Sequence, residues 1–248
     1  PAVEDYDLPT LCGDIRAAMD TFGQQRVAVV GHDWGALVAW HLAMLDEARV
    51  IALATLSVPY AGRPKRPATE ILAAAFAERF NYILYFQQPG VAEAELDADI
   101  ERSLRLFFRD PGDEDPFLQD KPAGARLFDG QSAPEQLPAW CSREDLDFYI
   151  RAFAGRGFRG ALNWYRNFER NWQLNESLAG RQVLQPTLFL VGEHDPVARL
   201  EAYTLKRMTE VVPRLEMHWL DCGHWIQNER PQAVTERLLD FLDRHYPA

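Results

Sequence analysis

The sequence is poor in cysteine, has no cluster of positive charge and contains no long apolar run. Its three cysteines, Cys12, Cys141 and Cys222, are an odd number at wide spacing. This argues against a disulfide framework or a cysteine metal site and favours a reducing, cytoplasmic compartment. No apolar stretch approaches the ~18 residues that a membrane helix needs, so we expect no membrane span. A formal net charge of −11 without a Lys/Arg cluster argues against a nucleic-acid partner, and we predict none.

The sequence also lacks an initiating methionine, a signal-like segment and any strand before its first helical pattern. Since a complete gene product normally begins otherwise, we expect a segment upstream of Pro1. The 248 residues, 47% hydrophobic and 25% charged, are enough for one globular unit with a sizeable core. No motif suggests a cofactor, and we predict neither a cofactor nor a metal.

One stretch combines a strand, a sharp turn and a helix: residues 26–45, RVAVV-GHDWG-ALVAWHLAML. Its valine-rich start is typical of a parallel strand buried on both faces, and its apolar second half favours a buried helix. A chain that passes from strand to helix so quickly pushes the residue at the turn out of the sheet and needs small neighbours. Gly31 and Gly35 meet this need, so the pattern predicts a nucleophile elbow with Asp33 at its apex.

An aspartate at this position indicates attack on a saturated carbon. A serine would form an inert ether there, whereas Asp33 would form an alkyl ester that water can cleave at the aspartyl carbonyl, which regenerates the enzyme. The alternative is that Asp33 only caps the following helix, a common role for aspartate. Taken alone, Gly-x-Asp-x-Gly favours the capping role.

The order of apolar segments predicts an α/β fold with a helical insertion. Residues 50–56 (VIALATL) read as a second buried strand, which completes a βαβ unit. No buried strand follows until residues 187–191, and residues 215–220 alternate as a partly exposed strand does. The intervening part favours helices over 91–109, 142–153 and 160–171, with an irregular acidic loop over 110–138, and a last helix is expected over 231–244. We predict core segments over 1–61 and 186–248 and a helical cap domain over 62–185.

Three polar residues follow predicted strands, where the functional groups of open α/β sheets gather. They are Asp33, Asp195 and His224, in the order nucleophile, acid, histidine that is typical of α/β-hydrolases. Singly, Asp195 could merely form a turn before Pro196, and His224 could merely pack in its loop. Their joint order favours a catalytic triad, with Asp221 as the second candidate for the acid.

The chain resembles the epoxide hydrolases of the α/β-hydrolase superfamily, of the soluble mammalian and plant type. The resemblance rests on GHDWGA at the elbow, NYILYFQQPGVAEAEL and GFRGALNWYRNFERNW in the expected cap, and DCGHWIQNERP near the end. It covers essentially the whole chain and implies an α/β-hydrolase fold with a helical cap (lid) domain. The family's His-Gly-x-Pro loop and first strands are absent from this sequence, so the N-terminal part of the sheet is expected to be missing.

The resemblance implies that Asp33 attacks an epoxide carbon and that His224, oriented by Asp195, activates water to release a vicinal diol. Two cap tyrosines assist ring opening; we place them at Tyr82 and Tyr165, with Tyr85 as the competitor of Tyr82. A phenol of pKa near ~10 can donate to a developing alkoxide without being ionised at neutral pH.

The resemblance further implies that Trp34 contributes its backbone N–H to the oxyanion. A small lipophilic epoxide and water are the expected partners, and a homodimer is left open. A haloalkane dehalogenase shares the aspartate elbow but would need halide-binding tryptophan or asparagine donors in place of the tyrosines. The missing His-Gly-x-Pro loop favours a second alternative, a truncated relative that binds a ligand or partner without turnover.

Overall fold

The computed structural model describes residues 1–111 and 115–246, and it divides into two compact units. The first comprises residues 1–6 and 64–172, and the second comprises residues 7–63 and 173–248. We refer to them as the helical unit and the sheet unit. Part of the loop predicted over 110–138, residues 112–114, lies outside the described residues.

The sheet unit is built on four parallel strands in the order β1-β2-β3-β4. The strands are β1 (Val27–His32), β2 (Val50–Leu56), β3 (Thr187–Gly192) and β4 (Leu215–Leu220). Among the described residues, β1 pairs with β2 only, and Val30 on β1 is 50% exposed. All strands run the same way, so their carboxyl ends lie along one edge of the sheet. The α/β class predicted from the sequence is therefore correct.

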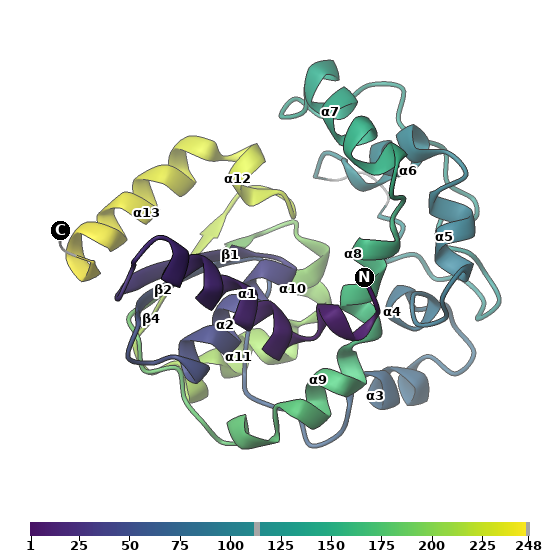
Figure 1. Ribbon diagram of the computed structural model, residues 1–248. Coiled ribbons are helices and arrows are strands. Elements are labelled where there is room, and N and C mark those ends of the chain that lie inside the picture. The colour runs from purple at the N-terminus through teal and green to yellow at the C-terminus, as the bar shows by residue number, and fades with distance from the viewer. Residues whose placement is uncertain (112–114, 247–248) are drawn as a thin grey trace. The chain divides into compact units, whose positions relative to one another are not determined.

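Helices cover both faces of this sheet. They are α1 (Leu8–Thr21), α2 (Trp34–Leu45), η2 (Glu176–Leu178), α10 (Pro196–Leu200), α11 (Ala202–Val211), α12 (Ile226–Glu229) and α13 (Pro231–His245). Figure 1 shows α13 on one side of the sheet and α2 with α11 on the other. Alternate residues of β2 and β3, such as Ala54 and Leu188, are buried with Val234 and Phe241 of α13. None of the helices within residues 1–111 and 115–246 is long and apolar enough to cross a membrane.

The helical unit contains no strand among its described residues. Its elements are η1 (Glu4–Tyr6), α3 (Ala68–Ala75), α4 (Tyr82–Tyr85), α5 (Val91–Leu96), α6 (Ile100–Phe107), α7 (Arg143–Ala154), α8 (Arg159–Arg166) and most of α9 (Phe168–Leu174). Ser142 caps α7 as the sequence predicted, since its hydroxyl accepts from the Asp145 backbone N–H at 3.1 Å.

Two predicted helices are each interrupted, and both interruptions have a local cause. The helix predicted over 91–109 is two helices, because Asp99 is extended and caps α6 by accepting from the Arg102 backbone N–H at 2.9 Å. The helix predicted over 160–171 breaks at buried Asn167, whose side-chain amide donates to the carbonyls of Val3 and Asn163. Such side-chain bonds to the backbone compete with the regular helix ladder.

Candidate active site

Asp33 occupies the sharp turn between β1 and α2, where its backbone is strained. Its φ of 53° and ψ of −121° lie in a region that residues with a side chain rarely adopt. The turn also brings two backbones together, since a Cβ added at Gly31 would lie 2.2 Å from the carbonyl oxygen of Gly35. Glycine is therefore required at position 31. A capping side chain accepts from the second or third N–H of its helix. Asp33 forms no such cap hydrogen bond to α2, so the capping alternative is not supported.

Each of the four strands delivers one polar residue to the same edge of the sheet. Asp33 follows β1, Ser57 follows β2, Asp195 follows β3, and His224 follows β4. The sequence predicted three of these four residues. Ser57 was missed, although it directly follows a predicted strand and the others were chosen because they follow predicted strands.

Asp195 orients the ring of His224 from a fully buried position. Its Oδ1 lies 3.1 Å from Nδ1 of His224, and the side chain is 0% exposed. The hydroxyl of Ser57 donates to Oδ2 of Asp195 at 2.6 Å and lies 3.0 Å from the same Nδ1. Oδ1 also accepts from the Val197 backbone N–H at 2.9 Å, so the carboxylate caps α10 as well. Both carboxylate oxygens of Asp195 therefore accept hydrogen bonds from neighbouring groups, and this fixes the imidazole of His224 that faces them.

The other ring nitrogen of His224, Nε2, lies 3.5 Å from Oδ1 of Asp33. Burial disfavours the charged imidazole, but the hydrogen bonds and charges of Asp195 and Asp33 outweigh it and raise the pKa of His224 to about 10. Burial likewise disfavours the Asp33 carboxylate, yet His224 and the backbone N–H of Trp34 hold the pKa of Asp33 below its usual range. Both shifts favour an imidazolium that lies between two carboxylates in the resting site.

His32 lies beside this site as a neutral ring. Burial and the neighbouring charge of His224 lower the pKa of His32. Its Nε2 donates to the backbone carbonyl of His224 at 2.8 Å, and a carbonyl can only accept, so Nε2 carries the single proton. This hydrogen bond ties the ring of His32 to the backbone of His224.

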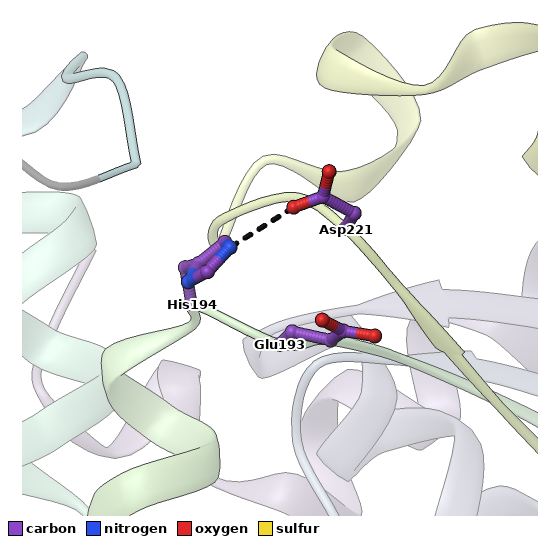
Figure 2. A group of neighbouring side chains, drawn as sticks. All are labelled: Glu193, His194 and Asp221. Carbon is purple, nitrogen blue, oxygen red and sulfur yellow. Dashed lines mark hydrogen bonds and ion pairs between the residues drawn. The ribbon is translucent and has the colours of Figure 1, made fainter.

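Asp221, the second candidate for the acid, pairs with a different histidine. Its Oδ1 lies 3.0 Å from Nε2 of His194, and its side chain is 76% exposed. Figure 2 shows this pair beside Glu193 on the loops after β3 and β4. The three side chains offer ligand atoms within 4.8 Å of one another, but exposed groups of this kind are common without a metal. Asp195 is therefore the acid that faces His224.

The two tyrosines chosen from the sequence lie together within the helical unit. The rings of Tyr82 on α4 and Tyr165 on α8 have centroids 5.9 Å apart and meet edge to face at 76°. Tyr85 instead donates its hydroxyl to Oε2 of Glu95 at 2.8 Å. Burial and the Glu95 carboxylate raise the pKa of Tyr85. Glu95 also accepts from the backbone N–H groups of Leu127 and Phe128, so the hydrogen bond of Tyr85 belongs to a structural network.

Comparison with known proteins first defines the class. A family model described as the alpha/beta hydrolase fold matches residues 1–231. The chain is therefore an α/β-hydrolase, in agreement with its parallel sheet, its elbow and the order of its polar residues.

The individual proteins that this chain resembles are named as epoxide hydrolases. Epoxide hydrolase A of Mycobacterium tuberculosis is 44% identical over 97% of this chain and 76% of its own length. The crystal structure of epoxide hydrolase A from Mycobacterium thermoresistibile has a TM-score of 0.91 at 44% identity, covering 98% of this chain and 77% of that one. Bifunctional epoxide hydrolase 2 of Sus scrofa is 37% identical over 98% of this chain but only 43% of its own length. The chain thus belongs to the epoxide hydrolase family, and the alternatives of a dehalogenase or a non-catalytic binder are not favoured.

Proposed function

We propose that Asp33, His224 and Asp195 carry the epoxide hydrolysis of this family in two steps, through an ester on Asp33. The observation that carries the proposal is the strained aspartate at the elbow with the imidazole 3.5 Å from its carboxylate. The Asp33 carboxylate is a nucleophile without further activation. The imidazole of His224, whose Nε2 faces Asp33, is held at its other nitrogen, Nδ1, by buried Asp195.

In the first step an oxygen of Asp33 forms a bond to one epoxide carbon while that carbon's bond to the ring oxygen breaks. We assign the proton that the ring oxygen needs to the hydroxyls of Tyr82 and Tyr165. The edge-to-face contact of the two rings supports treating them as a pair. The commitment of Tyr85 to Glu95 supports Tyr82 over Tyr85.

In the second step His224 acts as a base. Ester formation removes the charge of Asp33, so the imidazolium loses one of its two carboxylate partners and releases a proton, which restores the tyrosine through solvent. Neutral His224 then takes a proton from water, and the hydroxide adds to the aspartyl carbonyl. The acyl–oxygen bond breaks, the diol leaves, and the Asp33 carboxylate and the imidazolium return together.

Trp34 is our candidate for the oxyanion donor in this second step. Its backbone N–H already donates to the Asp33 carboxylate in the resting site. The same donor would therefore face the negative oxygen that develops when water attacks the ester. A preorganised donor of this kind typically contributes ~10²–10³ in rate.

We further propose a small lipophilic epoxide as the substrate. The aromatic surroundings of Tyr82 support this, since its ring contacts Phe117 at 4.7 Å and Phe86 at 5.7 Å between centroids. The helical unit would serve as the cap domain predicted over 62–185. Three buried, free cysteines support a reducing cytoplasmic location. A homodimer remains a hypothesis.

Diol formation and halide release, measured side by side on an aryl epoxide and a chloroalkane, test the proposed function. We expect diol without halide, and we expect Asp33→Asn to abolish it while the exposed Asp221→Asn retains it. Diol formation that survives Asp33→Asn would refute the role of Asp33.

A further inference from the structure

The backbone on both sides of His224 is held by one carboxylate, that of Glu229. Its Oε2 accepts from the Gly223 N–H at 2.6 Å, and its Oε1 accepts from the Trp225 N–H at 3.0 Å. Glu229 is the last residue of the short helix α12 (Ile226–Glu229), which begins two residues after His224. This single turn of helix brings the Glu229 carboxylate back to the two peptide groups that flank His224. Hydrogen bonds to an ionised acceptor are about twice as strong as neutral ones.

The third backbone group of this segment is held from another direction. The carbonyl of His224 accepts from Nε2 of neutral His32, whose Nδ1 lies 3.5 Å from the side-chain amide of Gln227. The loop also packs tightly against the end of β3, since a Cβ added at Gly192 would lie 2.3 Å from the carbonyl oxygen of Gly223. The main chain around His224 is therefore fixed on three sides.

This fixation matters because the two bonds of the imidazole are unequal. Nδ1 lies 3.1 Å from Asp195, which is buried and accepts from Ser57 and Val197, whereas Nε2 lies 3.5 Å from Asp33, a longer contact. A small rotation of the loop backbone would keep one contact and change the direction of Nε2, the nitrogen that must take the proton from water. Proton transfer requires heavy atoms within about 2.6–3.2 Å, so its rate is sensitive to such a displacement.

We propose that Glu229 is a positioning residue for the base: its carboxylate, by bridging the amides of Gly223 and Trp225, directs Nε2 of His224 toward the hydrolytic water. This inference rests on the proposed function and adds a residue to it. Glu229 touches no reacting atom in the first step, so its effect should fall on ester hydrolysis alone.

Glu229→Gln is the informative substitution, because it keeps the size of the side chain but turns one of the two acceptors into a donor. That amide group then faces a backbone N–H, and one of the two bonds is lost. We expect single-turnover kinetics to show ester formation within about twofold of wild type and ester hydrolysis slowed about tenfold, which corresponds to ~1.4 kcal/mol. Exposed Glu236 on α13 supplies the matched control, and Glu236→Gln should change neither rate.

Steady-state kinetics distinguish positioning from simple damage to the fold. When only hydrolysis slows, kcat and KM fall together and kcat/KM is unchanged, because kcat/KM reports the steps up to ester formation. A partly unfolded variant would instead lose kcat and kcat/KM equally at constant KM. Equal losses in Glu229→Gln would therefore overturn the proposal.

A second measurement does not depend on turnover. The Nδ1 proton of His224, hydrogen-bonded to Asp195, should give a downfield NMR resonance that moves in Glu229→Gln and stays in place in Glu236→Gln. An unmoved resonance together with unchanged hydrolysis would also overturn the proposal. A wild-type protein that forms no ester would instead overturn the proposed function, so the two failures are distinguishable.

Discussion

The charge of Asp33, together with that of Asp195, raises the pKa of His224, and removal of the Asp33 charge should favour the neutral imidazole, which can act as a base. Asp33→Asn is the appropriate change, because the amide has the shape of the carboxylate but, like the ester, has no charge. Two carboxylates raise the pKa of His224 to about 10 in the resting site. Loss of the Asp33 carboxylate, whose Oδ1 lies 3.5 Å from Nε2, destabilises the charged ring of His224, so the pKa of His224 must fall.

The size of the fall follows from distance and exposure. An opposite charge within ~4–6 Å shifts a pKa by about 1–3 pH units. The Asp33 side chain is 34% exposed, so solvent screens part of its field. Asp195, which remains, is fully buried and continues to favour the charged ring. We expect the pKa of His224 in Asp33→Asn to lie about 1–3 pH units below its wild-type value, closer to neutral pH.

NMR titration of protein labelled in its histidine rings measures this directly, and His224→Gln assigns the resonance by its loss. The Asp33 charge also favours protonated His32, so the pKa of His32 should fall in Asp33→Asn as well. An unchanged or higher pKa of His224 in Asp33→Asn would refute the reasoning. It would mean that ester formation does not release the base.

Three further predictions follow from the same contacts. Tyr82→Phe and Tyr165→Phe should each slow ester formation about 10–100-fold with little change in thermal stability. Tyr85→Phe loses the hydrogen bond to Glu95, so it should lower the free energy of unfolding by about 1.5 kcal/mol and retain activity. The reverse pattern would place the first catalytic tyrosine at Tyr85. Ser57→Ala should reduce kcat about tenfold at unchanged kcat/KM, because Asp195 loses a donor at 2.6 Å, and an unchanged kcat would make Ser57 a packing residue only. Because the pKa of His224 is raised from 6.5 to about 10, the stability that its charge contributes is complete below pH 6.5 and is lost as the pH rises toward 10, so the difference in melting temperature between wild type and His224→Gln should shrink over that interval.

The sequence predicted those parts of the molecule that depend on local pattern. The continuous apolar run of residues 50–56 identified β2 to the residue, and Gly31 and Gly35 identified the turn that places Asp33. Asp195 and His224 could be chosen because each follows a predicted strand. Their mutual contact required only that parallel strands share an edge.

What the sequence did not predict depends on contacts between distant segments. Beyond its place after a predicted strand, nothing in the sequence around Ser57 indicates a role. Only the pairing of β2 with β3 places its hydroxyl oxygen 2.6 Å from Oδ2 of Asp195. The break at Asn167 depends on the carbonyl of Val3, more than 160 residues away. Glu229 lies in a family motif as one charged residue among several, and only the fold of α12 directs it back to the peptides around His224.

The central claim is that Asp33 becomes covalently attached to the substrate, and a single turnover in heavy-oxygen water tests it most directly. His224→Gln should consume about one equivalent of epoxide and stop, with the added mass on the peptide that contains Asp33. Wild-type protein after one turnover should carry the heavy oxygen on the Asp33 carboxylate, and the diol should contain ordinary oxygen from the protein, because water attacks the aspartyl carbonyl. Heavy oxygen in the diol with none on Asp33 would show that water attacks the epoxide itself, and would contradict the account.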